Sequence, residues 1–414
     1  MTRIYVQKFG GSSLATPERL QECAEITHRR MEGGDQVVVV VSAMGSTTEQ
    51  LISLARSLGI GHDSSSHDLL LASGEQISAA AMSLALSRYG HDSVPLSGGA
   101  AGLVTDGRPG CSEVVEINPE RVNHELSHGR IPVVMGFQGM SRQGTLTLLG
   151  RGGSDTTAVV LAGALQTHLN SPRCEIYTDV DGVHTSDPKL VPHTSLLASI
   201  GYKPMHTLSR LGAQVMASTA VHYADCLQVP VRVCNSRTPG NGTMIEPQYD
   251  SFAPQGIIAC AVTEELSRIQ LDLPQASPAL ISDFLHATSE SELVFHQREY
   301  NESEDSTRLE YTASPLVIDD LASTITHELT RTPSETVKMT IERSLARIAV
   351  VGNDLTRHSS TLNRSRKYLG SVGIGTKAWS LVDDTHCTFF VRSEDAHEAL
   401  RATHRSLDLE STPQ

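Results

Sequence analysis

Short runs of β-branched residues alternate with helical stretches along residues 1–245 of the chain. The runs predict strands at Ile4–Lys8, Gln36–Ser42, Pro132–Phe137, Glu175–Asp179 and Val231–Asn235. The stretches between them predict helices at Pro17–Glu32, around Thr48–Leu58, at Gln76–Tyr89, from residues 154–156 through Ala164, and at Ser209–Tyr223. Alternation of this kind is typical of an α/β fold, a mainly parallel sheet with helices on both faces. Ligands bind such sheets at the carboxyl ends of the strands, in loops that enter helices.

The pattern changes after the polar, proline-containing stretch Glu246–Gln255, which we interpret as a linker between domains. Residues 257–335 and 336–410 each indicate the order strand, helix, strand, strand, helix, strand. The elements behind this interpretation are Arg268–Leu273, Pro278–Ala287, Glu292–Gln297, Ala346–Val351, Ser360–Leu369, Thr385–Val391 and Glu394–Arg405. The acidic residues 299–310 predict a surface loop, and Leu409–Gln414 a polar tail. Domains are therefore expected at 1–245, 257–335 and 336–410, with a linker at 246–256.

The size and charge of the chain limit the classes of function. Its 414 residues are 39% apolar, which is enough for two or three domains with hydrophobic cores. A net charge of −14 argues against a general nucleic-acid binder, which needs a basic face. A few well-placed cations still suffice to hold an anionic small molecule. Lysines are scarce, so a lysine that contacts phosphate must come from Lys8, Lys189, Lys203, Lys338, Lys367 and Lys377.

Several features favour a cytoplasmic protein. The seven cysteines are scattered and show no metal-binding spacing, which favours reduced thiols in a cytosolic setting. The N-terminus lacks the apolar core of a signal peptide. The longest clear apolar run, Val37–Val41, is far shorter than a membrane span. We therefore expect a soluble chain without a membrane or nucleic-acid partner.

The first candidate motif, Lys8-Phe9-Gly10-Gly11-Ser12-Ser13, stands where the first strand ends and a helix begins. Glycines there let backbone N–H groups approach phosphate oxygens, and a lysine adds a full positive charge. The motif matches neither of the two commonest nucleotide loops, GxxxxGK[ST] and GxGxxG. The alternative is an ordinary strand–turn–helix joint with a surface lysine.

A second corner, Arg151-Gly152-Gly153-Ser154-Asp155-Thr156-Thr157, repeats this composition before a helix of small residues. Ser154 or Asp155 is explained equally well as a helix N-cap. Arg151, however, carries a guanidinium that can bind a carboxylate in bidentate fashion. Two glycine-paired turns, each led by a cation, are unexpected by chance in one α/β domain.

Three further stretches carry candidate binding residues. The strand end Tyr177–Val183 and the following Ser186–Lys189 form an acidic turn, which an ordinary Asp-Gly turn also explains. Glu75, which precedes a predicted helix, is either a capping carboxylate or the partner of a substrate ammonium. Ser42 and Thr47 bracket a glycine-containing loop after the second strand.

These residues together resemble one family. The stretches that carry the resemblance are KFGGSS (8–13), VVVVVSAMGSTTEQL (37–51), LLASGEQIS (70–78), GFQGM (136–140), TLLGRGGSDTTAVVLA (147–162) and CEIYTDVDGVHTSDP (174–188). They resemble, in this order, the aspartate kinases of the amino acid kinase superfamily. Residues 257–335 and 336–410 are similar, more weakly, to the paired ACT regulatory domains of that family, which are ferredoxin-like.

The resemblance implies the ATP-dependent phosphorylation of L-aspartate, or of a related small amino acid, on its side-chain carboxylate. It implies that Lys8, Gly10, Gly11 and Ser12 surround the transferring phosphoryl group and that Asp155 orients the lysine. It assigns the amino acid substrate to Ser42, Thr47, Glu75, Arg151, Gly152, Gly153 and Ser154. It assigns the nucleotide to Thr178, Asp179, Asp181, Gly182, Lys189 and Gln214. Mg²⁺ is expected to be coordinated by the ATP phosphates and water, with few dedicated protein ligands. The ACT-like units are expected to hold a homo-oligomer.

Three stretches depart from the family pattern. Gln214 stands where the family usually has a lysine that reaches the phosphates, and residues 201–206 lack the usual acidic pattern. Gln275–Pro278 and Arg357–Ser360 lack the Pro-Gly turn of effector-binding ACT units, which predicts weak or absent feedback by lysine or threonine. Two alternatives therefore stay open: a kinase for another amino acid carboxylate, and a catalytically weak regulatory paralogue.

Overall fold

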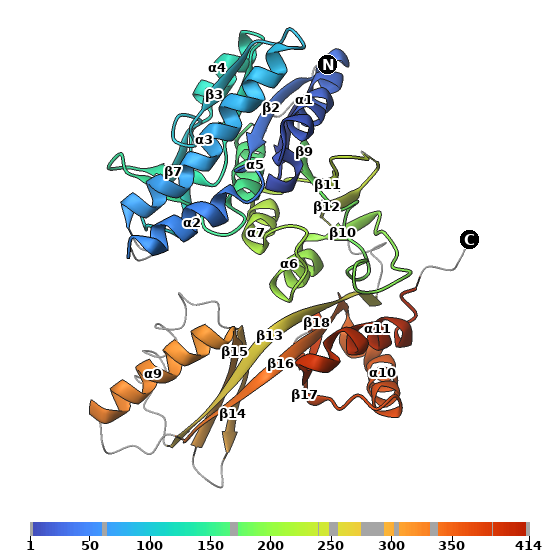
Figure 1. The fold of residues 1–414 in the computed structure, drawn as a ribbon. Helices are drawn as coiled ribbons and strands as arrows, with labels where there is room; N and C mark the ends of the chain where they lie inside the picture. Colours follow the sequence, from blue (N-terminus) through green and yellow to red (C-terminus); the bar gives the residue numbers. More distant parts are fainter. Residues whose placement is uncertain are drawn as a thin grey trace. The chain divides into compact units, whose positions relative to one another are not determined.

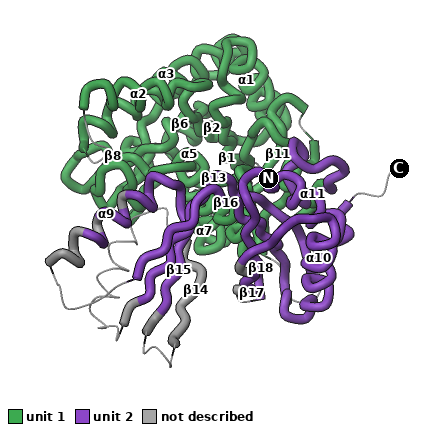
Figure 2. The backbone as a smooth tube through the Cα atoms, turned by 60° about the horizontal axis from the view of Figure 1, so that its bottom comes forward, with its two compact units in different colours: residues 1–184, 196–253 green, residues 185–195, 254–414 purple. Residues whose placement is uncertain are grey.

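The chain forms two compact units, which are shown in separate colours in Figure 2. The computed structural model describes residues 3–59, 64–165, 173–238, 240–247, 256–274, 294–301, 306–331, 338–382 and 384–410. Unit 1 comprises residues 1–184 and 196–253, and unit 2 comprises residues 185–195 and 254–414.

Unit 1 is built on a sheet that has eight strands in the described part of the chain, in the order β10–β12–β11–β9–β1–β2–β6–β3. Its strands are β1 (Ile4–Phe9), β2 (Gln36–Val41), β3 (Ser93–Leu96), β6 (Ile131–Met135), β9 (Arg173–Thr178), β10 (Ser199–Gly201), β11 (Val231–Asn235) and β12 (Thr243–Glu246). Neighbouring strands are parallel, except that β11 and β12 are antiparallel. The predicted, mainly parallel sheet is therefore confirmed.

Helices surround this sheet (Figure 1). They are α1 (Pro17–Glu32), α2 (Thr47–Ser57), α3 (Ser65–Ser87), α4 (Glu120–Ser127), α5 (Gly153–Ala164), α6 (Tyr202–Arg210) and α7 (Ser218–Leu227). Helix α1 begins where the sequence predicts, because Thr16 caps it by accepting a hydrogen bond from the Arg19 N–H and Pro17 needs no such partner.

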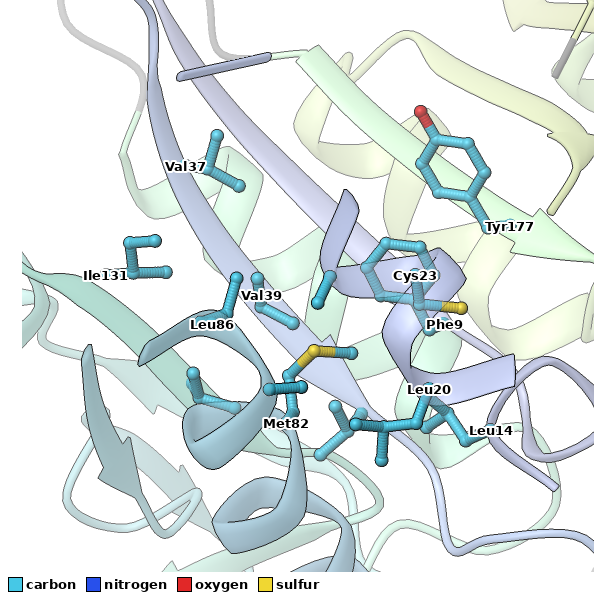
Figure 3. Close-up of a cluster of buried hydrophobic side chains, with 14 of the residues drawn as sticks. Phe9, Leu14, Leu20, Cys23, Val37, Val39, Met82, Leu86, Ile131 and Tyr177 are labelled. Atoms are coloured by element: carbon cyan, nitrogen blue, oxygen red, sulfur yellow. The ribbon is translucent and has the colours of Figure 1, made fainter. Parts of the chain in front are cut away.

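Side-chain alternation along the strands sorts the residues onto the two faces of the sheet. Val37 and Val39 of β2 lie in one core cluster with Met82 of α3 (Figure 3). Phe9 faces the same cluster and stacks on Tyr177, with ring centroids 5.0 Å apart. Successive side chains of a strand point to opposite faces. Lys8, which precedes Phe9 on β1, therefore points to the face against which α5 lies.

By length and composition alone, helix α3 could cross a membrane. In the apolar stretch of 18 residues that meets this criterion, half of the residues are buried. Two carboxylates, Asp68 and Glu75, lie buried within it, and both accept hydrogen bonds from unit 1. Since α3 also contributes Met82 and Leu86 to the core cluster, we interpret it as a core helix.

Unit 1 differs from the sequence prediction in several places. Strands β3, β10 and β12 and helix α4 were not predicted. The helix predicted at 209–223 is two helices, α6 and α7, because the chain breaks at Gly212 with φ of 125°. Helix α3 begins at Ser65, well before the predicted Gln76. A second sheet, of four strands in the described residues, follows the order β5–β4–β7–β8 and was not predicted. Its strands are β4 (Leu103–Thr105), β5 (Val114–Ile117), β7 (Gln138–Ser141) and β8 (Leu146–Leu148), too short for a recognisable alternation.

Unit 2 contains an antiparallel sheet with six strands in the residues that the structure describes, in the order β14–β15–β13–β16–β18–β17. Its strands are β13 (Gly256–Pro274), β14 (Val294–Asn301), β15 (Ser306–Ala313), β16 (Lys338–Asn353), β17 (Lys377–Val382) and β18 (His386–Arg392). Its helices are α9 (Pro315–Arg331), α10 (Ser359–Ser371) and α11 (Ala396–Ser406). The predicted C-terminal α+β region is thus confirmed. Strands β13 and β16 pair over most of their length, so the two predicted ACT-like units share one sheet.

Two predictions for this region are wrong. Residues 299–310 are not a loop throughout, because β14 and β15 pair as a hairpin. Alternation explains this, since Leu309 and Tyr311 enter a hydrophobic core while Glu310 pairs with Arg268. The expected polar tail begins with a buried contact, because Leu409 packs against the core that contains α11. The helix predicted at 278–287 and the stretch Gln275–Pro278 lie outside the described residues.

The segment 185–195, expected within residues 1–245, belongs to unit 2. Val191 explains this, because it is 2% exposed and lies in the core cluster with Leu362, Leu400 and Phe389. Lys189, a predicted nucleotide contact, is therefore carried by a segment that is anchored in unit 2.

Candidate active site

The candidate loops of unit 1 begin at one edge of the sheet. In the parallel register Phe9 pairs with Val41 and with Tyr177, and Val41 pairs with Met135. The carboxyl ends of β1, β2, β6 and β9 are therefore level, and the loops that follow these strands start side by side. This is the location at which ligands bind open α/β sheets.

Lys8 and Asp155 form a buried ion pair at this edge. The lysine Nζ lies 2.6 Å from Asp155 Oδ1, and each side chain is 11% exposed. Lys8 points toward α5 because of its position on β1, and Asp155 lies in the first turn of α5. The ion pair thus joins the end of β1 to the start of α5, so two of the motifs singled out in the sequence meet here. Arg151 lies two residues before α5, at the entrance to the same turn.

Backbone hydrogen bonds fix the glycine corner after β1. The Gly10 N–H donates to the Tyr177 carbonyl at 3.1 Å, and the Gly45 N–H donates to the Gly11 carbonyl at 3.0 Å. A Cβ at Gly11 would lie 2.8 Å from the Ala43 carbonyl oxygen, so only glycine allows this approach. Gly11 also opens a single 3₁₀ turn, Gly11–Leu14, in which Ser12 is exposed. The corner is therefore held to the loops that follow β9 and β2.

The second glycine corner is shaped by its neighbours. Gly152 adopts φ of 72° as the N-cap of α5, and a Cβ there would lie 2.0 Å from the Ala217 Cβ. A Cβ at Gly153 would lie 2.9 Å from the ring of Phe137. Both glycines are thus required by close contacts, and Ser154, which follows them, is buried.

Replacing Gly152 by Ala is expected to distort this corner and raise at least tenfold the KM of a substrate that binds there, because the new Cβ meets Ala217. The matched control is Gly144→Ala. Gly144 also has a positive φ, 82°, but has open space around its Cβ position. Both variants carry the backbone strain of about 1–2 kcal/mol, so only Gly152→Ala should change KM. Equal KM values in the two variants would contradict this role of the corner.

Glu75 is a buried carboxylate beside the loop after β2. Its Oε1 accepts a hydrogen bond from the Ala43 N–H at 2.9 Å. Burial raises the pKa of Glu75 to about 7, although this hydrogen bond opposes the rise. Its Oε2 is buried and has no hydrogen-bond partner among the described residues. Such a carboxylate is suited to receive a cationic group of a ligand.

Thr47 and Ser42 belong to the same loop. The Thr47 side chain lies 3.4 Å from the Cβ position of Gly74, next to Glu75, and its hydroxyl donates to the Met44 carbonyl at 2.6 Å. The Ser42 N–H donates to the Phe9 carbonyl at 3.2 Å. The structure therefore brings Ser42, Thr47 and Glu75 together around one loop.

The predicted nucleotide stretch follows β9. Asn235 at the end of β11 donates to Asp181 Oδ1 at 2.9 Å and to the Asp179 carbonyl at 3.3 Å. Thr178 donates through its hydroxyl to Asp179 Oδ1 at 3.1 Å. Gly182 lies so close to Thr243 that a Cβ would lie 2.5 Å from the threonine Oγ1.

Sequence reasoning missed Asn235 and Ser236 as residues that hold this region together. Ser236 donates its N–H to the Thr178 carbonyl at 2.9 Å, and its hydroxyl lies 2.8 Å from that of Ser13. The signal was available, because both residues stand at or just beyond the carboxyl end of a strand that neighbours β9.

Gln214 lies in the stretch between α6 and α7, outside both helices, and is exposed. Ala217, three residues later, is the residue against which Gly152 packs. Gln214 is therefore on a segment that contacts the second glycine corner. Lys189, in contrast, lies in the segment of unit 2, where Asp187 accepts its backbone N–H at 2.8 Å.

Residues 3–235 match the family model of the amino acid kinase family. Aspartokinase 2 of Bacillus subtilis is 32% identical over 410 residues, which cover 99% of each chain. The chain belongs to the aspartokinases of the amino acid kinase family. Aspartate kinase Ask_LysC of Stutzerimonas stutzeri is 30% identical, over 99% of this aspartokinase and 98% of the relative.

Solved structures agree with this fold. The crystal structure of E. coli aspartokinase III in complex with aspartate and ADP has a TM-score of 0.80 to this aspartokinase, at 21% identity. The match covers 98% of this chain and 100% of that one, so the likeness includes the C-terminal α+β region. The aspartate kinase of Synechocystis is 28% identical, with a TM-score of 0.53, and the match covers 99% of this chain and 70% of that one.

Proposed function

We propose that this aspartokinase transfers the γ-phosphoryl group of ATP to the side-chain carboxylate of L-aspartate. The products are 4-phospho-L-aspartate and ADP. The observation that carries the proposal is the buried pair of Lys8 and Asp155, set between two glycine corners at the carboxyl edge of the sheet. Full-length relatives that are named aspartokinases support the choice of substrate.

The chemistry needs charge neutralisation more than proton transfer. The acceptor carboxylate is already ionised at neutral pH, so no general base is required. A carboxylate oxygen forms a bond to the γ-phosphorus while the bond from this phosphorus to the ADP oxygen breaks. Two anions must be brought together, and catalysis therefore comes from positioning and from cations beside the phosphoryl group. In our proposal Lys8 supplies that cation, held by Asp155, with Gly10, Gly11 and Ser12 around the phosphoryl oxygens.

The amino acid is proposed to bind between the two corners. Arg151 takes its α-carboxylate together with the backbone of Gly152, Gly153 and Ser154, since a guanidinium binds a carboxylate in bidentate fashion. Glu75 takes the ammonium group through Oε2, which has no hydrogen-bond partner in the part of the chain that the structure describes. Ser42 and Thr47 line the same pocket in this proposal.

The nucleotide is proposed to contact Thr178, Asp179, Asp181, Gly182, Lys189 and Gln214. Mg²⁺ would be bound to the ATP phosphates and neutralise part of their charge, with few protein ligands.

We further propose a cytoplasmic homo-oligomer, assembled through the α+β region. Weak or absent feedback by lysine or threonine also stays a prediction. The second stretch behind it, Arg357–Ser360, spans the end of a 3₁₀ turn (Leu355–His358) and the start of α10.

Trapping the acyl phosphate with hydroxylamine tests the proposal. ATP, Mg²⁺ and a panel of amino acids are supplied, with and without lysine and threonine, and hydroxamate and ADP are measured. Aspartate is expected to give the highest kcat/KM. A better substrate would favour the first alternative, another amino acid carboxylate. Nucleotide binding without turnover for any amino acid would favour the regulatory paralogue, which Gln214 motivates.

Replacing Gln214 by Lys is expected to raise kcat on the order of 10²-fold, because it restores a charged donor to the developing transition state. KM for aspartate should not change, since the added charge faces the nucleotide. The control is Gln143→Lys, which adds the same charge at an exposed turn of unit 1. If Gln214→Lys and Gln143→Lys give the same kcat, the proposed position of Gln214 beside the phosphates is wrong.

A further inference from the structure

Phe137 lies just after β6 and has a left-handed backbone, with φ of 70°. A bulky residue rarely adopts this conformation, and the surrounding structure must hold it there. Both backbone groups of Phe137 are bonded: its N–H donates to Thr157 Oγ1 at 3.2 Å, and its carbonyl accepts the Leu149 N–H at 2.9 Å. Backbone strain of this kind clusters at sites that bind ligands, so the contacts that maintain it point to a function.

The Thr157 hydroxyl joins Phe137 to the second glycine corner. Thr157 lies in the second turn of α5 and is fully buried. Its hydroxyl accepts the Phe137 N–H and donates to the Gly153 carbonyl at 2.9 Å. A helical threonine commonly donates to the carbonyl four residues earlier, but this habit does not explain the bond that Thr157 accepts from another element. The Cβ position of Gly153 lies 3.1 Å from Phe137 Cα, so the two segments are also in close contact.

The chain after β6 also contacts α3, one turn before Glu75. Phe137 packs against the buried cluster that contains Leu71 and Ala72. Gln138, which is 1% exposed, donates through its side chain to the Ala72 carbonyl at 3.4 Å. The chain after β6 thus lies between the second glycine corner and the turn of α3 that leads to Glu75.

An amino acid carries its α-carboxylate and its ammonium group on one carbon atom. In the proposed function the α-carboxylate binds at the second glycine corner and the ammonium group binds Glu75. Both groups bind at once only when the distance between the corner and Glu75 is correct. We propose that Thr157 is a positioning residue for the amino acid: its hydroxyl holds Phe137 in the left-handed conformation and thereby sets this distance. The inference rests on the proposed function, and it requires no contact of Thr157 with the substrate.

The test compares L-aspartate with succinate, which carries two carboxylates but no ammonium group. KM for aspartate, KM for ATP, Ki for succinate and Tm are measured, together with the aspartate dissociation constant by calorimetry. Thr157→Val removes the hydroxyl and is expected to raise KM and Kd for aspartate about tenfold. Ki for succinate and KM for ATP should stay within about twofold, because neither ligand binds both groups. Thr157→Ser keeps the hydroxyl and should restore the original KM and Kd.

Thr27→Val is the matched control. Thr27 of α1 is also fully buried, and its hydroxyl also bonds two groups, the Gln7 side chain at 3.0 Å and the Cys23 carbonyl at 3.4 Å. Because Gln7 and Lys8 are neighbours on β1, Thr27 lies on the face of the sheet opposite α5. Thr27→Val should therefore lower Tm about as much as Thr157→Val does, without changing KM or Kd for aspartate.

Each deviating outcome has one meaning. If Thr27→Val raises Kd for aspartate as much as Thr157→Val, the effect is one of general stability and the positioning role is overturned. If Ki for succinate rises as much as Kd for aspartate, Thr157 supports only the carboxylate corner, and its role in setting the distance is overturned.

Two variants of the proposed ligand contacts separate the inference from the proposed function. Arg151→Met and Glu75→Gln should each raise Kd for aspartate. If both do so and Thr157→Val does not, the positioning role is overturned and the proposed binding mode stands. If neither raises Kd, the proposed amino acid site fails, and the inference fails with it. The calorimetric arm keeps the test valid even for a protein without turnover.

Discussion

Replacing Lys8 by Met is expected to lower kcat about 10³-fold, the largest effect of any single substitution in this aspartokinase. The lysine Nζ lies 3.5 Å from the Cβ position of Gly10, and Asp155 in the first turn of α5 holds this ammonium at 2.6 Å. In our proposal this ammonium neutralises charge on the transferring phosphoryl group, which water cannot do as well in a buried site. ADP release in a coupled assay measures the loss.

Loss of folding must be separated from loss of chemistry, because Lys8→Met leaves the Asp155 carboxylate buried without its cation. Breaking a buried ion pair in this way costs about 3–5 kcal/mol of stability. The double variant Lys8→Met/Asp155→Asn removes the stranded charge and should recover most of the lost Tm while kcat stays low. Lys367→Met, at an exposed position of α10, controls for the loss of a charge elsewhere. A folded Lys8→Met enzyme that keeps kcat within tenfold of the original would falsify the proposed role.

The sequence predicted this part of the site because strand periodicity and glycine spacing are local signals. Alternation on β1 puts Lys8 and Phe9 on opposite faces, and the run of valines identifies β2 as a buried neighbour. Parallel strands then bring their carboxyl ends to one edge. These rules account for the loops that follow β1, β2 and β9. The second cation-led corner follows β8 of the smaller sheet, and the Lys8–Asp155 ion pair is what joins it to the end of β1.

Contacts between distant segments were beyond such rules. Nothing in the local pattern of residues 185–195 reveals that Val191 joins a core formed by Leu362 and Leu400. The shared sheet of unit 2 was not predicted for the same reason. Strands β13 and β16 are long, but in the sequence each looks like several shorter elements. Burial of the thiols also depends on such contacts: Cys23, Cys174, Cys234, Cys260 and Cys387 are buried, whereas Cys111 and Cys226 are exposed.

Replacing Glu75 by Gln is expected to raise KM for aspartate about 10²-fold at pH 8, with a smaller effect on kcat. The amide keeps the oxygen that accepts the Ala43 N–H but cannot carry charge. Truncating one partner of a buried charge pair costs about 2–5 kcal/mol of binding. Because burial raises the pKa of Glu75 to about 7, the original enzyme should bind aspartate better as pH rises from 6 to 8. The variant should show a high KM that does not follow this trend.

The stability of the ligand-free enzyme should also depend on the ionisation of Glu75, but it should fall with rising pH, whereas aspartate binding improves. The raised pKa means that the folded state favours the neutral acid, so its contribution is complete below the ordinary value of 4.5 and is lost as pH rises through about 7. The loss amounts to about 3 kcal/mol in the ligand-free enzyme. Glu75→Gln, which mimics the neutral acid, should therefore have the higher Tm at pH 8 and should lose this advantage near pH 4.5.

Glu49→Gln, at an exposed position of α2, is the matched control and should change neither KM nor the pH dependence of Tm. The expected changes in aspartate binding and in stability both depend on one atom, the buried Oε2 of Glu75, which has no hydrogen-bond partner among the described residues. A group that weakens the empty protein when ionised and strengthens the complex is typical of a site built for a ligand's cation. A Glu75→Gln enzyme that binds aspartate normally at pH 8, yet is more stable there, would show that the carboxylate is buried for another reason.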